Sequence, residues 1–173
     1  MAQATTIIDL ARFSLSYGEG KRLDAPVRLE PLEMGGQTYV PTPASPTVRL
    51  DISRPSGGYA FRLRFPLHLE GSCMRCLDPA TIDLEIDARE VDQRDTEDED
   101  LLSPYVVDGE LDIGRWAHDS AVLAIPPQLL CRPDCAGLCP VCGESLNDSD
   151  PETHQHDSGI DPRWDKLKNL KLE

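Results

Sequence analysis

The chain has 173 residues and a formal net charge of −14, with a sequence pI near 4.6. A summed negative potential of this size repels phosphate, which excludes broad non-specific attraction to nucleic acid or to anionic lipid. The hydrophobic fraction of 39% and the charged fraction of 28% are close to globular averages, which argues against wholesale disorder.

The length suits one main domain with a small appendage. No segment has the unbroken apolar length of a membrane span, and the first residues lack a basic stretch followed by an apolar one. We therefore expect a cytoplasmic protein. In a reducing compartment, paired cysteines are more often metal ligands or catalytic thiols than structural disulfides.

The first part of the chain predicts short strands and turns, because the apolar runs 6–10 and 27–32 alternate with glycine and proline. The segment Val40–Pro46 carries three prolines, which remove hydrogen-bond donors, so it is expected to be a loop or a sheet edge. The main sheet is expected to begin after this segment.

Two half-buried strands follow, because apolar residues occupy every second position from Tyr59 to Leu69 and again from Ile82 to Ile86. The Cys73-x-x-Cys76 pair lies between these two strands and is therefore predicted to cap a hairpin. Such a turn can direct both sulfurs at one metal ion. The polar face of the strands carries Arg62, Arg64, His68, Glu70, Asp83, Glu85 and Asp87.

An acidic loop is predicted over 92–103, where carboxylates dominate and only Arg94 opposes them. Self-repulsion keeps such a segment solvated. It is interpreted either as a surface loop that keeps the protein soluble or as a docking strip for a basic partner. Its carboxylates are Asp92, Asp95, Glu97, Asp98, Glu99 and Asp100.

Two helices are predicted. The first lies near 112–124, with Asp112 as its N-cap and Pro126 after its end. The second follows Asp161, where Pro162 suits the first helical position and an apolar stripe follows. The expected fold class is α+β, mainly an antiparallel β-sheet with one central helix, a C-terminal helix and zinc-knuckle elements. We expect residues 1–130 to form the β-rich domain and residues 131–173 to form a cysteine-rich zinc segment on which the C-terminal helix packs.

The cysteines indicate zinc. Cys139-Pro-Val-Cys142 followed by Gly143 has the short spacing that a tetrahedral site requires, and glycine relieves the tight turn. In an extended segment, His154 and His156 would share one face and could complete that site. The remaining four cysteines would then form a second site. These groups are Cys139, Cys142, His154 and His156, and Cys73, Cys76, Cys131 and Cys135.

The cysteines, the histidines and the arginines of the strand face each allow a second interpretation. Cys131, Cys135, Cys139 and Cys142 could bind one ion together, which would leave Cys73 and Cys76 as a half-site or a redox pair. The two histidines could instead belong to a polar tail. On the strand face, the basic residues Arg62, Arg64 and Arg75 could contact RNA or could pair with carboxylates on the neighbouring strand.

At these residues the chain resembles the YceD family of large ribosomal RNA subunit accumulation proteins, over roughly the half from Cys73 to Lys171. The order and spacing of four segments carry the resemblance. Many members have Cys-x-Cys where this chain has His154-x-His156. The four segments are Cys73-Met-Arg-Cys-Leu77, Pro126-Pro-Gln-Leu-Leu-Cys131, Cys135-Ala-Gly-Leu-Cys-Pro-Val-Cys-Gly143 with Leu146-Asn147, and Asp161-Pro-Arg-Trp164.

The resemblance implies a non-enzymatic role in ribosome biogenesis that supports accumulation of large-subunit ribosomal RNA. The sequence is consistent with a non-enzymatic role, because it contains no phosphate-binding glycine motif and no nucleophile elbow. No catalytic residue is therefore assigned. The acidic charge favours a basic ribosomal protein or a pre-ribosomal particle as partner over generic RNA binding. One or two structural zinc ions are expected. The alternative function is a thiol–disulfide redox protein that uses Cys73 and Cys76.

Overall fold

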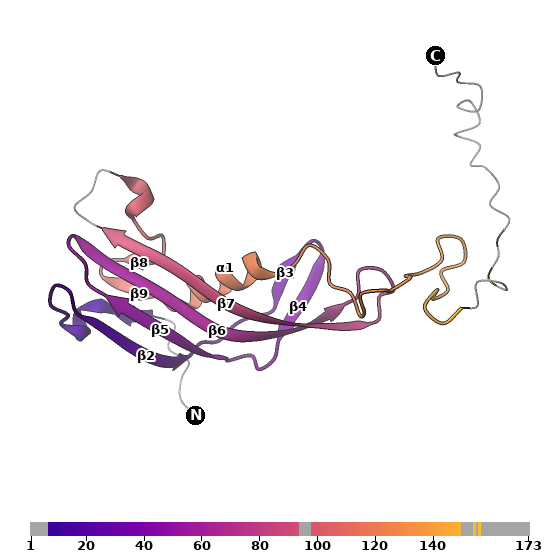
Figure 1. Ribbon diagram of the computed structural model, residues 1–173, viewed down its shortest axis with the longest axis horizontal. Helices are drawn as coiled ribbons and strands as arrows, with labels where there is room; N and C mark the ends of the chain where they lie inside the picture. The colour runs from indigo at the N-terminus through magenta and orange to yellow at the C-terminus, as the bar shows by residue number, and fades with distance from the viewer. Residues whose placement is uncertain (1–6, 94–97, 150–153, 155, 157–173) are drawn as a thin grey trace, which may run out of the picture.

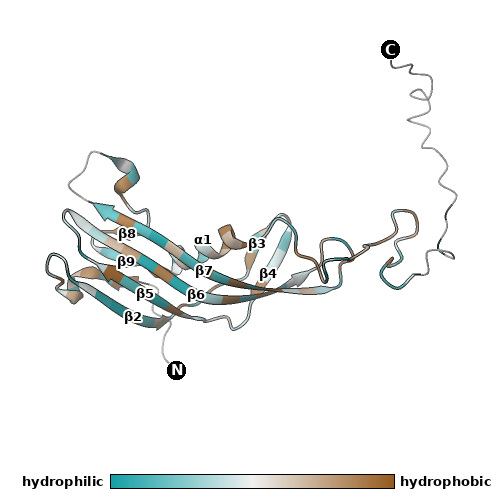
Figure 2. Cartoon of the chain, viewed as in Figure 1, coloured by the Kyte–Doolittle hydropathy of each residue, from teal (hydrophilic) through white to brown (hydrophobic). Residues whose placement is uncertain are grey.

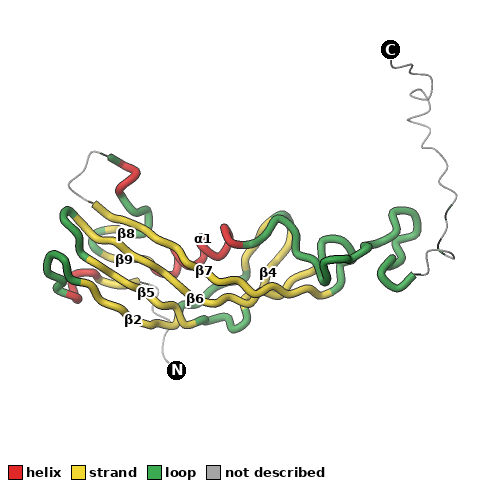
Figure 3. Tube along the Cα trace, viewed as in Figure 1, coloured by secondary structure: helices red, strands yellow, loops and turns green. Residues whose placement is uncertain are grey.

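The computed structural model describes residues 7–93, 98–149, 154 and 156 (Figure 1). Strands make up most of the described secondary structure, and the cysteine-rich segment extends beyond one end of the main sheet (Figure 3). The main sheet is antiparallel, as the sequence predicted. Its strands are β2 (Gly20–Pro26), β3 (Leu32–Met34), β4 (Gln37–Pro41), β5 (Thr47–Ser53), β6 (Gly58–Ser72) and β7 (Pro79–Gln93).

The β6–β7 hairpin is the longest element, because all 15 residues of one strand pair with the 15 residues of the other. Since β7 occupies one edge of β6 along its whole length, β5 and then β4 pair with the other edge. At the open end of the hairpin, Gly58 lies so close to Asp92 that a Cβ atom at position 58 would overlap the Asp92 carbonyl oxygen.

A second, smaller sheet and one α-helix complete the described fold. The small sheet has the order β1-β9-β8. The helix begins after Asp112, whose side chain accepts a hydrogen bond from the Arg115 backbone N–H at 2.9 Å. The elements are β1 (Ile7–Asp9), β8 (Val106–Val107), β9 (Glu110–Asp112), α1 (Ile113–Ala124) and the short 3-10 turns η1 (Leu10–Phe13) and η2 (Glu99–Leu101).

The core lies on one face of the main sheet. Alternate residues of β5 and β6 are buried there, which gives the alternating brown and teal along these strands in Figure 2. From α1, Trp116 is only 2% exposed, and its ring lies 6.4 Å from that of Phe61 and 6.0 Å from that of Tyr105. The helix thereby joins the main sheet to the loop before β8.

Several sequence predictions agree with the structure. The two alternating strands are β6 and β7, and the helix near 112–124 is α1. The C-terminal helix expected after Asp161 lies outside the described residues. Among the residues that the structure describes, no helix is long and apolar enough to cross a membrane.

One prediction about the first half of the chain is wrong. The main sheet begins before the proline segment, because β2 pairs with β5 over its whole length. Its alternation is weak since only Leu23 and Ala25 are partly buried at this sheet edge. Residues 27–31 form no strand, because Val27 and Leu29 donate single hydrogen bonds to the carbonyls of Pro46 and Ala44 instead of joining a ladder.

The acidic loop predicted over 92–103 is shorter than expected. Asp92 belongs to β7, is 3% exposed and accepts a hydrogen bond from the Ser103 backbone N–H at 3.4 Å. Ser103 is itself buried, so the two ends of the segment are tied together. Residues 94–97 lie outside the described residues.

The polar face of the main sheet is occupied by ion pairs. Arg62 forms a two-pronged pair with Asp87 at 2.7 and 2.6 Å, and Asp51 lies between Arg22 and Arg64. The Arg62 hydrogen bond is the main cause that lowers the pKa of Asp87. Two residues of the basic patch considered for RNA contact, Arg62 and Arg64, are therefore neutralised by carboxylates on neighbouring strands, whereas Arg75 donates to the Cys135 carbonyl.

Trp116→Ala should destabilise the fold by about 3–5 kcal/mol, because removing a buried aromatic ring leaves a cavity against β6. Urea unfolding followed by circular dichroism measures this change. Leu123→Ala on the same helix is the matched control, since Leu123 is 86% exposed and its truncation should cost little. An equal loss in both variants would contradict the packing described for α1.

Candidate metal centres

The turn of the β6–β7 hairpin presents Cys73 and Cys76 on the same side. The turn is closed by hydrogen bonds from the Cys73 N–H to the Asp78 carbonyl at 2.7 Å and from the Leu77 N–H to the Cys73 carbonyl at 2.9 Å. The backbone N–H of Arg75 points at the Cys73 sulfur, 3.4 Å away. Because a thiolate accepts such hydrogen bonds, the turn is prepared to hold negative charge on this sulfur.

The segment after α1 docks on this turn and brings two further cysteines to it. Arg75 is at the centre of the contact: its guanidinium donates to the Cys135 carbonyl at 2.9 Å, and its own carbonyl accepts from the Leu138 N–H at 3.2 Å. Gly137 has a positive φ of 82°, and a Cβ there would lie 3.2 Å from the same Arg75 carbonyl oxygen. The close approach of the two loops therefore favours glycine at this position.

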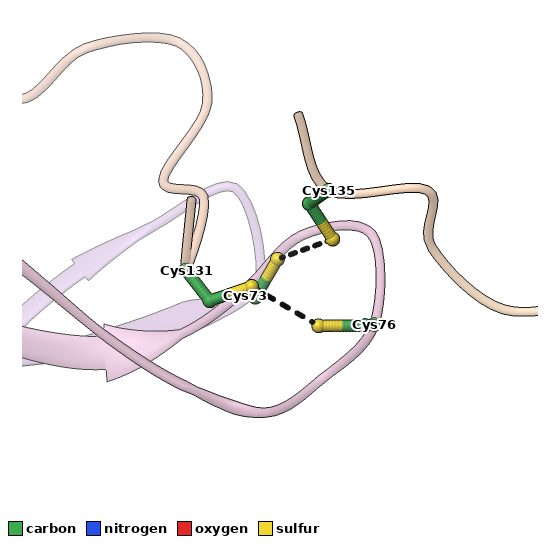
Figure 4. Close-up of side chains that lie close together, drawn as sticks. All are labelled: Cys73, Cys76, Cys131 and Cys135. Carbon is green, nitrogen blue, oxygen red and sulfur yellow. Dashed lines mark hydrogen bonds between the residues drawn. The ribbon is translucent and has the colours of Figure 1, made fainter. Parts of the chain in front are cut away.

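Four sulfurs converge at the hairpin turn (Figure 4). The sulfur of Cys73 lies 3.7 Å from that of Cys135, and the sulfur of Cys76 lies 3.5 Å from that of Cys131. These distances are too long for disulfides, and all four cysteines are free. A tetrahedral ion bound at about 2.3 Å would separate its sulfur ligands by about 3.8 Å, so the spacing fits a shared metal ion.

This first group is mostly shielded from solvent. Cys73 is 0% exposed, Cys135 is 1% exposed and Cys76 is 5% exposed, whereas Cys131 is on the surface. Asn147 supports the group from outside, because its amide donates to the Cys135 sulfur at 3.5 Å while its carbonyl oxygen accepts from the Ala136 N–H at 2.8 Å. Asn147 is part of the family resemblance, but the sequence pattern predicted no contact for it.

A second group forms farther along the chain from Cys139, Cys142, His154 and His156, whose ligand atoms lie within 4.8 Å of one another. The Cys142 sulfur is 3.7 Å from His154 Nε2, and the Nε2 atoms of the two histidines are 3.2 Å apart. A tetrahedral ion with bonds of about 2.3 Å to sulfur and about 2.0 Å to nitrogen would separate a sulfur from a nitrogen ligand by about 3.5 Å and two nitrogen ligands by about 3.3 Å.

The second group has its own turn and its own supporting carboxylate. The Gly143 N–H donates to the Cys139 carbonyl at 2.9 Å, and the Val141 N–H points at the Cys139 sulfur from 3.4 Å. Glu144 lies 3.4 Å from His154 Nδ1. A carboxylate at the far nitrogen of a histidine orients the ring and leaves Nε2 available as a ligand. The sequence pattern did not indicate this role of Glu144.

Each group contains one thiol whose pKa falls to about 6. For Cys73, burial opposes ionisation, but hydrogen bonds from the backbone of Cys131, Cys76 and Arg75 outweigh it and lower the pKa to about 6. For Cys139, hydrogen bonding by His154 is the main cause that lowers the pKa to about 6. A thiolate is the metal-binding form of cysteine, so both groups contain a thiol that can bind a cation near neutral pH.

The structure places the eight candidate ligands in two groups. Cys131 and Cys135 lie with Cys73 and Cys76 rather than with Cys139 and Cys142, so the single site of four consecutive cysteines is not the arrangement found. His154 and His156 meet the second cysteine pair. Both groups could hold a metal ion.

The comparisons with known proteins match the same part of the chain. The family model described as large ribosomal RNA subunit accumulation protein YceD matches residues 61–171. This range contains both groups of candidate ligands and nearly all of β6, from Phe61 onward.

The similar curated proteins are mycobacterial, and each is named as an uncharacterized protein. Those of Mycobacterium bovis and Mycobacterium tuberculosis are each 38% identical over 106 residues, which is 58% of this chain and 49% of theirs. One of Mycobacterium leprae is 41% identical over 75 residues, 43% of this chain and 33% of its own length. The chain thus spans half or less of the length of these relatives. No solved structure matches the chain.

Cys76→Ser should lower the melting temperature more than Cys142→Ser. Cys76 is buried and joins the main hairpin to the segment after α1, whereas Cys142 is exposed and belongs to a local loop. We expect a difference of at least about 2 kcal/mol, or about 4–8 °C for a chain of this size. Thermal unfolding of the two variants under reducing conditions measures it. Equal melting temperatures would contradict the unequal roles of the two groups.

Proposed function

The chain belongs to the YceD family of large ribosomal RNA subunit accumulation proteins, and on this premise we propose that it is a non-enzymatic ribosome biogenesis factor. The observation that carries the proposal is the family match over residues 61–171. In its role the protein supports accumulation of large-subunit ribosomal RNA during maturation of the subunit in the cytoplasm.

The partner is a basic ribosomal protein or a precursor particle that contains one. The formal charge of −14 supports this choice, because such a protein is repelled by bare RNA and attracted to cationic protein segments. The arginines of the main sheet do not reverse the argument, since Arg62 and Arg64 are paired with Asp87 and Asp51. In this proposal the protein binds its partner by a protein–protein contact, and the partner is the component that binds RNA.

Zinc is the ion proposed for both cysteine groups, with a structural role. Thiolate and imidazole are the ligands that zinc prefers, and structural sites use four protein ligands without an open position. Each group supplies four such ligands at distances that fit a tetrahedral ion. The first group would fasten Cys131 and Cys135 to the hairpin, and the second would close a local loop.

The redox alternative is less well supported by the arrangement of the sulfurs. A redox function would require Cys73 and Cys76 to form and break a disulfide with each other by thiolate attack. In this fold, Cys73 is within 3.7 Å of Cys135, and Cys76 is within 3.5 Å of Cys131. Four converging thiols in a turn between two strands favour metal binding over disulfide exchange.

The purified protein should contain about two zinc ions per chain when no chelator is used. Cys76→Ser should lose one ion, and His154→Ala with His156→Ala should lose the other, as measured by inductively coupled plasma mass spectrometry. His118→Ala is the control, because His118 lies on α1 outside both groups. If the unmodified chain contains only one ion and Cys76→Ser keeps it, the result would favour a single site made by Cys131, Cys135, Cys139 and Cys142.

Depletion of the protein in its own cells should lower the amount of large ribosomal subunit relative to the small subunit. The reason is that large-subunit RNA no longer accumulates when its maturation fails. Sucrose-gradient profiles and the ratio of large-subunit to small-subunit ribosomal RNA measure the effect. Re-expression of the full chain should restore both. Unchanged large-subunit levels after depletion would remove this function and leave the metal centres unaffected.

A further inference from the structure

The small sheet has one buried face and one face on which the apolar side chains are exposed. Antiparallel pairing places Ile8, Leu111 and Val106 in one row, and all three are buried in the core. Because side chains alternate along a strand, their neighbours point the opposite way. On that opposite face, Ile7 is 51% exposed and Val107 is 64% exposed.

Two hollows flank the turn between β8 and β9. One has a volume of about 170 Å³ and lies between Ile7, Tyr105 and Glu110. The other, of about 360 Å³, is lined by Leu102, which is 44% exposed. Val107 and Asp108 belong to both hollows, so the two form neighbouring depressions on either side of one exposed valine. We refer to Ile7, Leu102, Val107, Asp108 and Glu110 as the β8–β9 face.

The charged residues that line the two hollows are all carboxylates, namely Asp92, Asp108, Glu110 and Asp112. Asp92 and Asp112 accept backbone hydrogen bonds within the fold, whereas Asp108 and Glu110 lie exposed at the turn. The nearby cation Arg115 lies at the margin of the smaller hollow, because its guanidinium is 5.6 Å from the ring centre of Tyr105, which lines that hollow. The guanidinium donates to the Pro104 carbonyl at 3.2 Å, and Arg115 itself lines neither hollow.

We propose that the β8–β9 face binds an extended, basic segment of a protein partner in which apolar residues alternate with lysine or arginine. This inference rests on the proposed function and names the surface by which the basic partner is held. In such a segment, an apolar side chain enters the hollow beside Val107, and the long side chains of the neighbouring cations bend back to Asp108 and Glu110, which line the same hollow.

The chemistry of the face disfavours other occupants. Phosphate groups of RNA would meet carboxylates in both hollows, which costs energy by like-charge repulsion. A second copy placed by two-fold symmetry would bring the same carboxylates together. The sequence placed the contact for a basic partner on the acidic stretch from Asp92 to Asp100, and Leu102, just after that stretch, is part of the β8–β9 face, where exposed apolar side chains lie beside carboxylates.

The test uses the full chain and a fluorescein-labelled peptide of about nine residues in which lysine alternates with valine, with binding followed by fluorescence anisotropy. Val107→Ser combined with Glu110→Gln should weaken binding about tenfold, since one exposed valine contact and one charge pair are lost. Val40→Ser combined with Glu85→Gln is the matched control, because Val40 is 45% exposed and Glu85 is exposed on the main sheet. The control should bind the peptide as the unmodified chain does.

Four results would overturn the proposal. They are no binding of the peptide to the unmodified chain, equal weakening in the control variant, displacement of the peptide by single-stranded RNA, and a dimer of the unmodified chain that the β8–β9 variant dissociates. Thermal unfolding confirms that both variants fold, and neither changes a buried residue.

A complementation experiment separates this inference from the proposed function. In depleted cells, the β8–β9 variant should fail to restore large-subunit levels while the control variant restores them. Full restoration by the β8–β9 variant would overturn the docking face and leave the function standing. Normal subunit levels after depletion alone would overturn the function, and the peptide measurement would still decide whether the face binds basic segments.

Discussion

The continuous pairing of β6 with β7 is the constraint on which the rest of this structure depends. Because all 15 residues of each strand are paired, the position of one end of the hairpin determines the position of the other. At the open end, Gly58 lies against Asp92, which ties the chain to Ser103 and the loop before β8. At the closed end, the turn presents Cys73 and Cys76. The first candidate metal group and the proposed docking face are therefore held by opposite ends of the β6–β7 hairpin (Figure 1).

The two candidate metal centres differ in what they join. The first connects residues more than fifty positions apart, since Cys73 meets Cys135 and Cys76 meets Cys131. It is also mostly buried, so an ion there would contribute directly to folding. The second connects residues at most 17 positions apart, and two of its four ligands, Cys142 and His156, are exposed. An ion bound there would order the chain locally and would have little effect on the main sheet.

Charge divides the surface into two functional types. On the main sheet, arginine and carboxylate side chains alternate across strands, and Asp51 pairs with both Arg22 and Arg64. That surface is close to neutral and offers no strong field to a partner. At the β8–β9 turn, the carboxylates Asp108 and Glu110 stand beside exposed apolar groups without compensating cations in the lining. In the proposed docking, the carboxylates select a basic partner at the place where exposed apolar side chains can also contact it.

The sequence by itself determined the features that depend on local order along the chain. Period-two alternation predicted β6 and β7, the Asp112 cap and the prolines at 126 and 127 predicted α1, and ligand spacing predicted the cysteine pairs. Only the tertiary structure decided how distant pairs combine, because the docking of Arg75 on Cys135 depends on contacts between loops that the sequence does not specify. It also showed that β2 belongs to the main sheet and that Asp92 is buried. Edge strands and buried carboxylates resemble loops in sequence, since their stability comes from neighbours that only the fold supplies.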